Sequence, residues 1–310
     1  MVCGALALLV FGCGDSPDPS WLVTKERLIA ITARVVGEPE RATPRPGETV
    51  EFTLEFVDAD ADAPSTWAFL ICEAETTSGV PFCREDSAIE ITDIELDPAM
   101  GGRPMSVTIP ADFEGSRVLV TGAVCMGGRL DITGIDLTSG TAPTREELCI
   151  EDDAEGQLAF FSHPIEQSDR SRSLSPVFSQ IRFGGEPWLE TDLTAGCTDG
   201  LPTVAIDDME SVIELERTEG SRESYPALDA DGMEITAMEE IRLAIFATDG
   251  GLQRQFSTFT ETNPIVEVDW EPPLSDDDPP FEGDVVRFWF VLRDLRGGYA
   301  TTARALCVNP

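Results

Sequence analysis

Apolar and polar side chains alternate with a period of two in many short segments of this 310-residue chain. In residues 50–56, valine, phenylalanine and leucine fill every second position, with glutamate or threonine between them. Residues 284–293 repeat the pattern, with valine, phenylalanine and leucine at 286, 288, 290 and 292. This period is that of a strand with one buried and one solvated face, and it predicts antiparallel sheets.

Short strands separated by Gly, Pro and Asp turns indicate an all-β chain of the sandwich type. Pro46-Gly47 and Gly297-Gly298 are two such turns. Trp67 falls on a predicted middle strand, which is typical of immunoglobulin-like sandwiches. Capping-box spacing at residues 144–147 predicts one short helix before Cys149. The strands are expected at residues 27–35, 50–56, 66–72, 104–109, 117–125, 177–183, 211–216, 240–246, 265–270, 284–293 and 299–308.

A chain of this length usually holds about two domains. We predict two immunoglobulin-like antiparallel β-sandwich domains, at residues 25–153 and 176–310. Residues 154–175 form a mixed stretch that ends in alternating Arg and Ser, and we predict that they are the linker.

The N-terminus is typical of a lipoprotein signal peptide. Its apolar run ends at Gly12 and covers about ten residues, which suits a signal h-region of about 7–15 residues and not a membrane span of about 20. Small Gly12 before Cys13 predicts cleavage there and lipidation of Cys13, although Phe11 is bulky and no basic residue precedes the run. An ordinary secretory signal or a buried apolar N-terminus is the alternative.

These features predict a signal peptide at residues 1–12, and the lipidated Cys13 with its Pro-bearing tether at residues 13–24. Stable anchoring takes at least two acyl chains, and thioether lipidation supplies several. The predicted location is the cell envelope, at the outer membrane or the periplasmic face, with the membrane held through Cys13.

The formal net charge of −37 repels nucleic acid phosphates, so no nucleic acid partner is expected. Solubility in salt water, collection of cations or a basic partner would each explain it. Nucleophilic catalysis has no motif here: no G-x-S-x-G elbow is present, and His163 is the only histidine. We therefore expect no catalysis and no required cofactor.

Calcium is the one metal with a candidate loop. Asp58, Asp60 and Asp62 alternate, but an EF-hand starting there would need Gly and Glu where Ala63 and Phe69 stand. A loop site for Ca²⁺ between strands stays open, against the alternative of a solvated acidic turn. Trp188 and Trp289 are candidates for a glycan-binding or peptide-binding surface, or else for the core.

The eight cysteines divide by position. Cys3 would leave with the signal peptide and Cys13 would carry lipid. An even number of remaining cysteines in an exported chain predicts three disulfides. No pair has C-x-x-C spacing, so a zinc site is poorly supported. The expected pairs are Cys72–Cys83, Cys125–Cys149 and Cys197–Cys307.

Segments 45–50 (Arg-Pro-Gly-Glu-Thr-Val), 246–251 (Phe-Ala-Thr-Asp-Gly-Gly), 268–273 (Val-Asp-Trp-Glu-Pro-Pro) and 291–298 (Val-Leu-Arg-Asp-Leu-Arg-Gly-Gly) occur in this order. Together with Cys13 they resemble the surface lipoproteins common in myxobacteria and their relatives. The resemblance implies Ig-like or PKD-like sandwiches, a lipid on Cys13 and no catalytic residues.

The leading hypothesis is a lipid-anchored envelope protein with a structural role or a role in binding an envelope protein or glycan. An exported hydrolase with an unrecognised carboxylate site and a Ca²⁺-stabilised adhesin are the alternatives.

Overall fold

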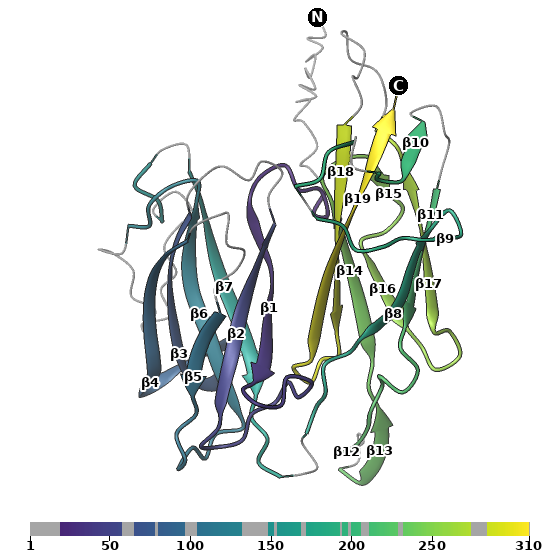
Figure 1. Ribbon diagram of the computed structural model, residues 1–310. Coiled ribbons are helices and arrows are strands. Elements are labelled where there is room, and N and C mark those ends of the chain that lie inside the picture. The colour runs from purple at the N-terminus through teal and green to yellow at the C-terminus, as the bar shows by residue number, and fades with distance from the viewer. Residues whose placement is uncertain are drawn as a thin grey trace, which may run out of the picture.

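The computed structural model describes residues 19–57, 65–77, 80–96, 104–131, 148–151, 154–168, 172–192, 194–197, 200–205, 211–228, 232–273 and 284–309. Within these residues the chain forms strands and no α-helix, so the all-β prediction is confirmed. The helix expected at residues 144–147 lies outside them. Figure 1 shows two groups of strands side by side, one from each half of the chain.

The N-terminal half forms two antiparallel sheets that face each other, here called the N-terminal sheet pair. One has the strand order β1-β2-β5 and the other β4-β3-β6-β7. The strands are β1 (Arg27–Val35), β2 (Thr49–Val57), β3 (Ser65–Thr77), β4 (Val80–Leu96), β5 (Pro104–Thr108), β6 (Arg117–Met126) and β7 (Glu155–Pro164).

Apolar side chains from both sheets fill the space between them. Phe52 and Leu54 of β2 pack in one core with Trp67 and Phe69 of β3, and none of the four is more than 1% exposed. Burial alternates along β2, since the glutamates and threonines between the core residues stay partly exposed. The period of two therefore identified the buried face correctly, and Trp67 is a core residue as expected.

The C-terminal half forms the C-terminal sheet pair, whose two five-stranded sheets also share one core. Their orders are β15-β17-β11-β8-β9 and β10-β19-β18-β14-β16, and a hairpin of β12 and β13 projects beyond them (Figure 1). The strands are β8 (Phe178–Phe183), β9 (Glu186–Pro187), β10 (Thr203–Ala205), β11 (Ser211–Arg217), β12 (Ser224–Leu228), β13 (Glu234–Met238), β14 (Ile241–Ala247), β15 (Gly251–Leu252), β16 (Phe256–Phe259), β17 (Ile265–Glu271), β18 (Asp284–Arg293) and β19 (Tyr299–Asn309).

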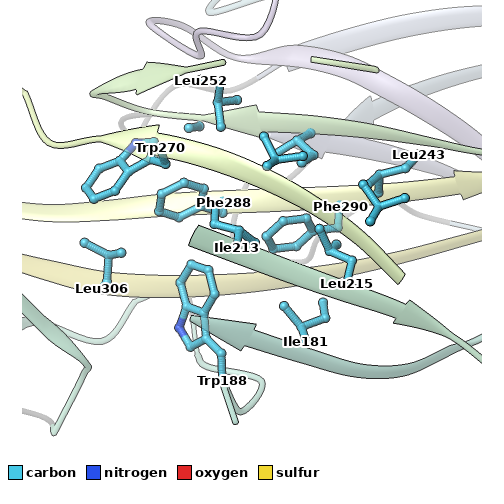
Figure 2. Close-up of a cluster of buried hydrophobic side chains, with 14 of the residues drawn as sticks. Ile181, Trp188, Ile213, Leu215, Leu243, Leu252, Trp270, Phe288, Phe290 and Leu306 are labelled. Carbon is cyan, nitrogen blue, oxygen red and sulfur yellow. The ribbon is translucent and has the colours of Figure 1, made fainter. Parts of the chain in front are cut away.

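Aromatic rings fill the centre of this second core (Figure 2). The ring of Phe288 lies edge-on to Trp270 at 5.4 Å and to Trp188 at 5.2 Å between centroids. Trp188 also donates its indole N–H to the carbonyl of Ala305 at 3.0 Å. Trp188 is 3% exposed and Trp289 is 7% exposed, so the idea that either forms an exposed aromatic binding surface is wrong.

Two expected boundaries differ from the structure. Glu155–Pro164, expected to start the linker, is β7 and pairs with β6 along its whole length. At the other boundary, residues 21–23 of the expected tether lie on the C-terminal sheet pair: the amide of Val23 donates to the carbonyl of Ala247 at 2.8 Å, and Trp21 packs against the core. The chain thus contacts its second half before it enters β1.

The three expected disulfides are present. Cys72–Cys83 joins neighbouring strands β3 and β4, and Cys125–Cys149 ties the end of β6 to residues that follow it by 24 positions. Cys197–Cys307 closes a separation of 110 residues and holds the segment before β10 on β19. Cross-links of this kind persist in oxidising compartments, which favours a location outside the cytosol.

Candidate functional site: the contacts between the sheet pairs

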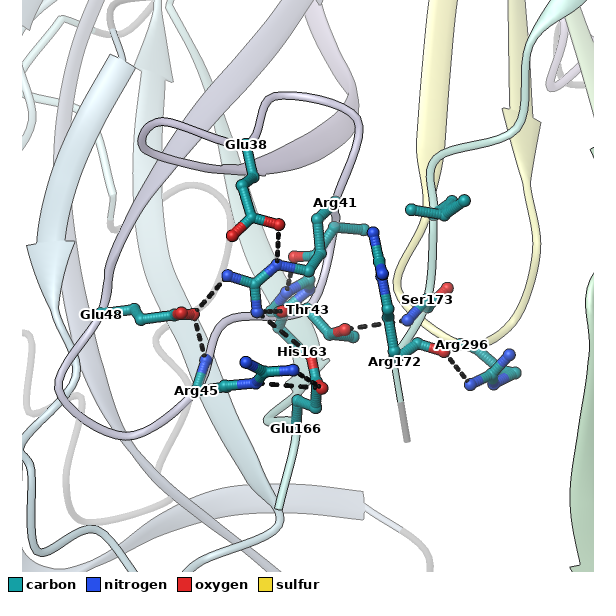
Figure 3. Close-up of polar contacts among 12 residues, drawn as sticks. Glu38, Arg41, Thr43, Arg45, Glu48, His163, Glu166, Arg172, Ser173 and Arg296 are labelled. Atoms are coloured by element: carbon teal, nitrogen blue, oxygen red, sulfur yellow. Dashed lines mark hydrogen bonds and ion pairs between the residues drawn. The ribbon is translucent and has the colours of Figure 1, made fainter. Parts of the chain in front are cut away.

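Charged side chains are buried where the two sheet pairs meet, and the centre of this polar junction is Arg41. Its side chain is 2% exposed, and its guanidinium lies 3.3 Å from Glu38, 2.7 Å from Glu48 and 3.1 Å from Glu166 (Figure 3). Burial acts to lower the pKa of Arg41, but its hydrogen bonds to Glu48 and Glu166 outweigh that effect and raise the pKa. Arg41 is therefore a charged residue in the interior.

Glu166 connects the end of β7 to the loop that follows β1. Its side chain is fully buried, and one oxygen accepts two hydrogen bonds from Arg45, at 3.1 Å from Nε and 2.7 Å from Nη2. Its other oxygen accepts from Arg41. Such a fork is the strong, geometrically specific form of an ion pair, so Glu166 fixes both arginines.

The segment at residues 173–175 runs between the sheet pairs and bonds to both. On the N-terminal side, the carbonyl of Ser173 accepts from Ala42 at 3.0 Å, and the amide of Ser175 donates to Glu40 at 2.9 Å. On the C-terminal side, the hydroxyl of Ser173 donates to Asp294 at 2.8 Å. The amide of Leu174 donates to Glu223 at 2.8 Å.

Two buried carboxylates complete the junction from the C-terminal side. Asp294 accepts the amides of Arg296 and Gly298, each at 2.8 Å, and holds the turn between β18 and β19. Glu239 is 1% exposed and accepts from Nη1 of Arg296 at 2.5 Å. Burial raises the pKa of Asp294, and burial together with the Asp294 charge raises the pKa of Glu239 to about 7.

Gly297 lets this turn approach the N-terminal sheet pair closely. Its φ is +109°, and a Cβ there would lie 2.8 Å from the Pro164 ring and 3.0 Å from His163. His163 itself is fully buried in β7, where Nε2 donates to the carbonyl of Ala42 at 2.9 Å. Burial lowers its pKa to about 4, so the imidazole is neutral. Its contacts are structural, and it lies in β7 and not in the linker expected at residues 154–175.

An apolar contact lies beside the polar junction. The outer face of β14, β18 and β19 presents Phe246, Trp289 and Val291 to Ala30 of β1 and Val57 of β2. The ring of Phe161 on β7 also meets Tyr299 on β19, with centroids 5.3 Å apart. Strands of the C-terminal half therefore have two buried faces, one in their own core and one against the N-terminal sheet pair.

The structure does not test the predicted calcium and lipid positions. Asp58, Asp60, Asp62 and Cys13 lie outside the described residues, so calcium binding and lipidation stay predictions. Among the residues that the structure places, no group of three or more His, Cys, Asp or Glu could hold a metal ion. In the same part of the chain, no helix is long and apolar enough to cross a membrane.

One carboxylate pair bears on the hydrolase alternative. Glu214 and Glu267 are direct cross-strand partners on β11 and β17, in a surface groove of about 580 Å³ that Arg254 also lines. Glu214 lies 3.4 Å from Arg182, and the backbone of Glu267 accepts from Arg254. These are the contacts expected of two glutamates that lie on a charged, solvent-facing side of a sheet.

The sequence did not single out Arg41, Glu166, Ser173, Asp294 or Glu239, although the structure buries all five in the polar junction. A comparison with protein-family models finds no match for this chain, and a comparison with curated proteins finds none either. The fold, the disulfides and the contacts between the sheet pairs therefore carry the functional proposal.

Proposed function

We propose that this chain is an exported, lipid-anchored protein of the cell envelope whose role is structural or ligand-binding and not catalytic. The three disulfides carry the proposal, because they require an oxidising compartment in which to form. The lipoprotein-type sequence around Cys13 supplies the membrane attachment. The polar junction supports a structural role, since its charged groups are held by protein partners and the segment at residues 173–175 bonds to both halves of the chain.

We also assign both sheet pairs to the immunoglobulin-like class, in line with the resemblance to myxobacterial surface lipoproteins. In each half, antiparallel sheets face each other over an aromatic core. The large buried Trp67 on inner strand β3 is what this class predicts. The disulfide at Cys72 joins neighbouring strands and does not bridge the two sheets as in antibody domains.

The anchor is tested by expressing the full chain in a bacterium that lipidates exported proteins and partitioning the extract between detergent and water. We expect the natural chain in the detergent phase and Cys13→Ala in the water phase. Cys3→Ala is the matched control, because it removes a cysteine of the predicted signal peptide and should leave partitioning unchanged. Equal partitioning of the natural chain and Cys13→Ala would refute lipidation, and reduced cysteines in the recovered protein would refute export.

A further inference from the structure

A groove of about 460 Å³ opens beside the apolar contact between the sheet pairs. It is lined by β1 and β7 on one side and by β14, β16 and the end of β18 on the other. Its size falls within the range of small-molecule sites, about 300–1,000 Å³, and boundaries between structural units are a preferred place for such sites.

The apolar contact continues into this groove. Ala244, Phe246 and Val291 belong to the covered contact and also line the groove. Farther out, Phe160 of β7 and Phe256 of β16 are 57% and 58% exposed. Their strands pair with the well-buried strands β6 and β14. The groove is therefore an uncovered extension of a face that is buried elsewhere.

The charge of the groove is opposite to that of the chain. Arg27 and Arg293 line it, and among its described lining residues there is no aspartate or glutamate, in a chain of net charge −37. Arg27 is held in place, since Nη1 donates to the carbonyls of Ser20 at 3.0 Å and Leu22 at 3.3 Å. Its guanidinium also lies 5.4 Å from the centre of the Phe246 ring.

The amides in the groove are occupied by the protein itself. Gln157 accepts from the amide of Leu28 at 3.2 Å and donates to its carbonyl at 3.3 Å. Gln255 accepts from the hydroxyl of Ser20 at 2.6 Å. The chemistry offered to a ligand is thus an apolar floor with positive charge and few uncharged polar groups.

We propose that this groove binds an anionic amphiphile of the long-chain carboxylate class, with its acyl chain on the apolar floor and its carboxylate at one of the two arginines. The proposal extends the ligand-binding role given above and does not require the anchor. In the anchored protein the groove would lie near such molecules. Cys13 precedes the groove residue Ser20 by seven positions, which span at most about 25 Å when extended.

The test uses the full chain carrying Cys13→Ala, so that no acyl chain of its own can compete. Dodecanoate, dodecanol and dodecyltrimethylammonium are each titrated by calorimetry below the concentration at which they form micelles. We expect saturable one-to-one binding of dodecanoate and at least tenfold weaker binding of the cationic amphiphile. The double variant Arg27→Gln and Arg293→Gln should weaken dodecanoate at least tenfold and change dodecanol little.

The matched control is Arg129→Gln with Arg182→Gln, which makes the same change in net charge away from the groove. Phe160→Ser and Phe256→Ser test the floor independently, because both rings are exposed and the fold should tolerate their loss. The proposal is overturned if the cation binds as tightly as dodecanoate, or if neither the arginine nor the phenylalanine variants weaken binding. Binding of an acidic octapeptide without binding of dodecanoate would overturn it too.

Discussion

The polar junction and the apolar contact join the same two sheet pairs by opposite means. In the junction, Arg41, Glu166, Asp294 and Glu239 are all buried, and specific partners satisfy their charge. In the apolar contact, Phe246 and Trp289 pack without such partners, and the contact opens into a groove at one side. The comparison indicates a division of roles, in which the junction sets the orientation of the halves and the apolar face can leave part of itself open for a ligand.

The largest effect is expected from breaking the junction at Glu166. Glu166→Ala leaves the buried Arg41 without one of its carboxylates, and removing one partner of a buried ion pair costs about 3–5 kcal/mol. Urea unfolding of the full chain measures this loss. The control is Glu240→Ala, which removes an exposed pair with Arg242 and should cost at most about 1 kcal/mol. Equal costs for the two variants would show that the buried Arg41–Glu166 pair contributes no more to stability than an exposed one.

The stability that the apolar contact provides should fall when Trp289 is substituted. Trp289→Ala removes a ring that is 7% exposed on the outer face of β18, and such truncations cost about 3 kcal/mol. Phe256→Ala is the matched control, because its ring lies on the same sheet but in the open groove and is 58% exposed. It should change stability by about 0.5 kcal/mol or less. If both variants cost the same in urea unfolding, the distinction between covered and open parts of this face fails.

The junction differs from the apolar contact in that its contribution to stability should depend on pH. The pKa of Glu239 is about 7 in the folded chain, above its ordinary value near 4.5, so the folded state holds an extra proton between these values. The contribution of Glu239 to stability should therefore fall as pH rises from about 4.5 through 7. Glu239→Gln should reduce the loss of stability between pH 5 and 8 by on the order of 1 kcal/mol. Glu240→Gln, at the neighbouring exposed position, should leave the slope unchanged when urea midpoints are compared between pH 5 and 8.

Most strands could be predicted from the sequence because their residues alternate or form short apolar runs bounded by turns. β1, β18 and most of β2 follow from Arg27–Val35, Asp284–Arg293 and the Val50 segment. β7 could not, because Leu158, Ala159, Phe160 and Phe161 are consecutive and apolar, and the two sides of this strand meet different neighbours. Short strands such as β9 and β15, with two residues each, give no periodicity to detect.

The junction could not be predicted because its contacts are long-range and its residue types are common. Arg41 and Glu166 are 125 positions apart, and the chain carries 58 acidic residues among which the pattern marks no special pair. The disulfides were predictable for the opposite reason. Only six cysteines remain after Cys3 and Cys13, and two of the expected pairs close short separations of 11 and 24 residues.

The most direct report on burial in the junction comes from His163. It is the only histidine in the chain, so its imidazole protons give a single titration curve by NMR. We expect a pKa of about 4, because burial disfavours the charged ring and Arg117 adds repulsion.

Since the folded pKa lies below the ordinary value of 6.5, this group's contribution to stability is complete above pH 6.5 and is lost as pH falls toward 4. That slope opposes the one from Glu239, so the junction should be most stable at mildly acidic pH. A histidine signal that titrates near 6.5 in the folded chain would show that solvent reaches the ring between β7 and Ala42, and that this side of the junction is not buried in solution.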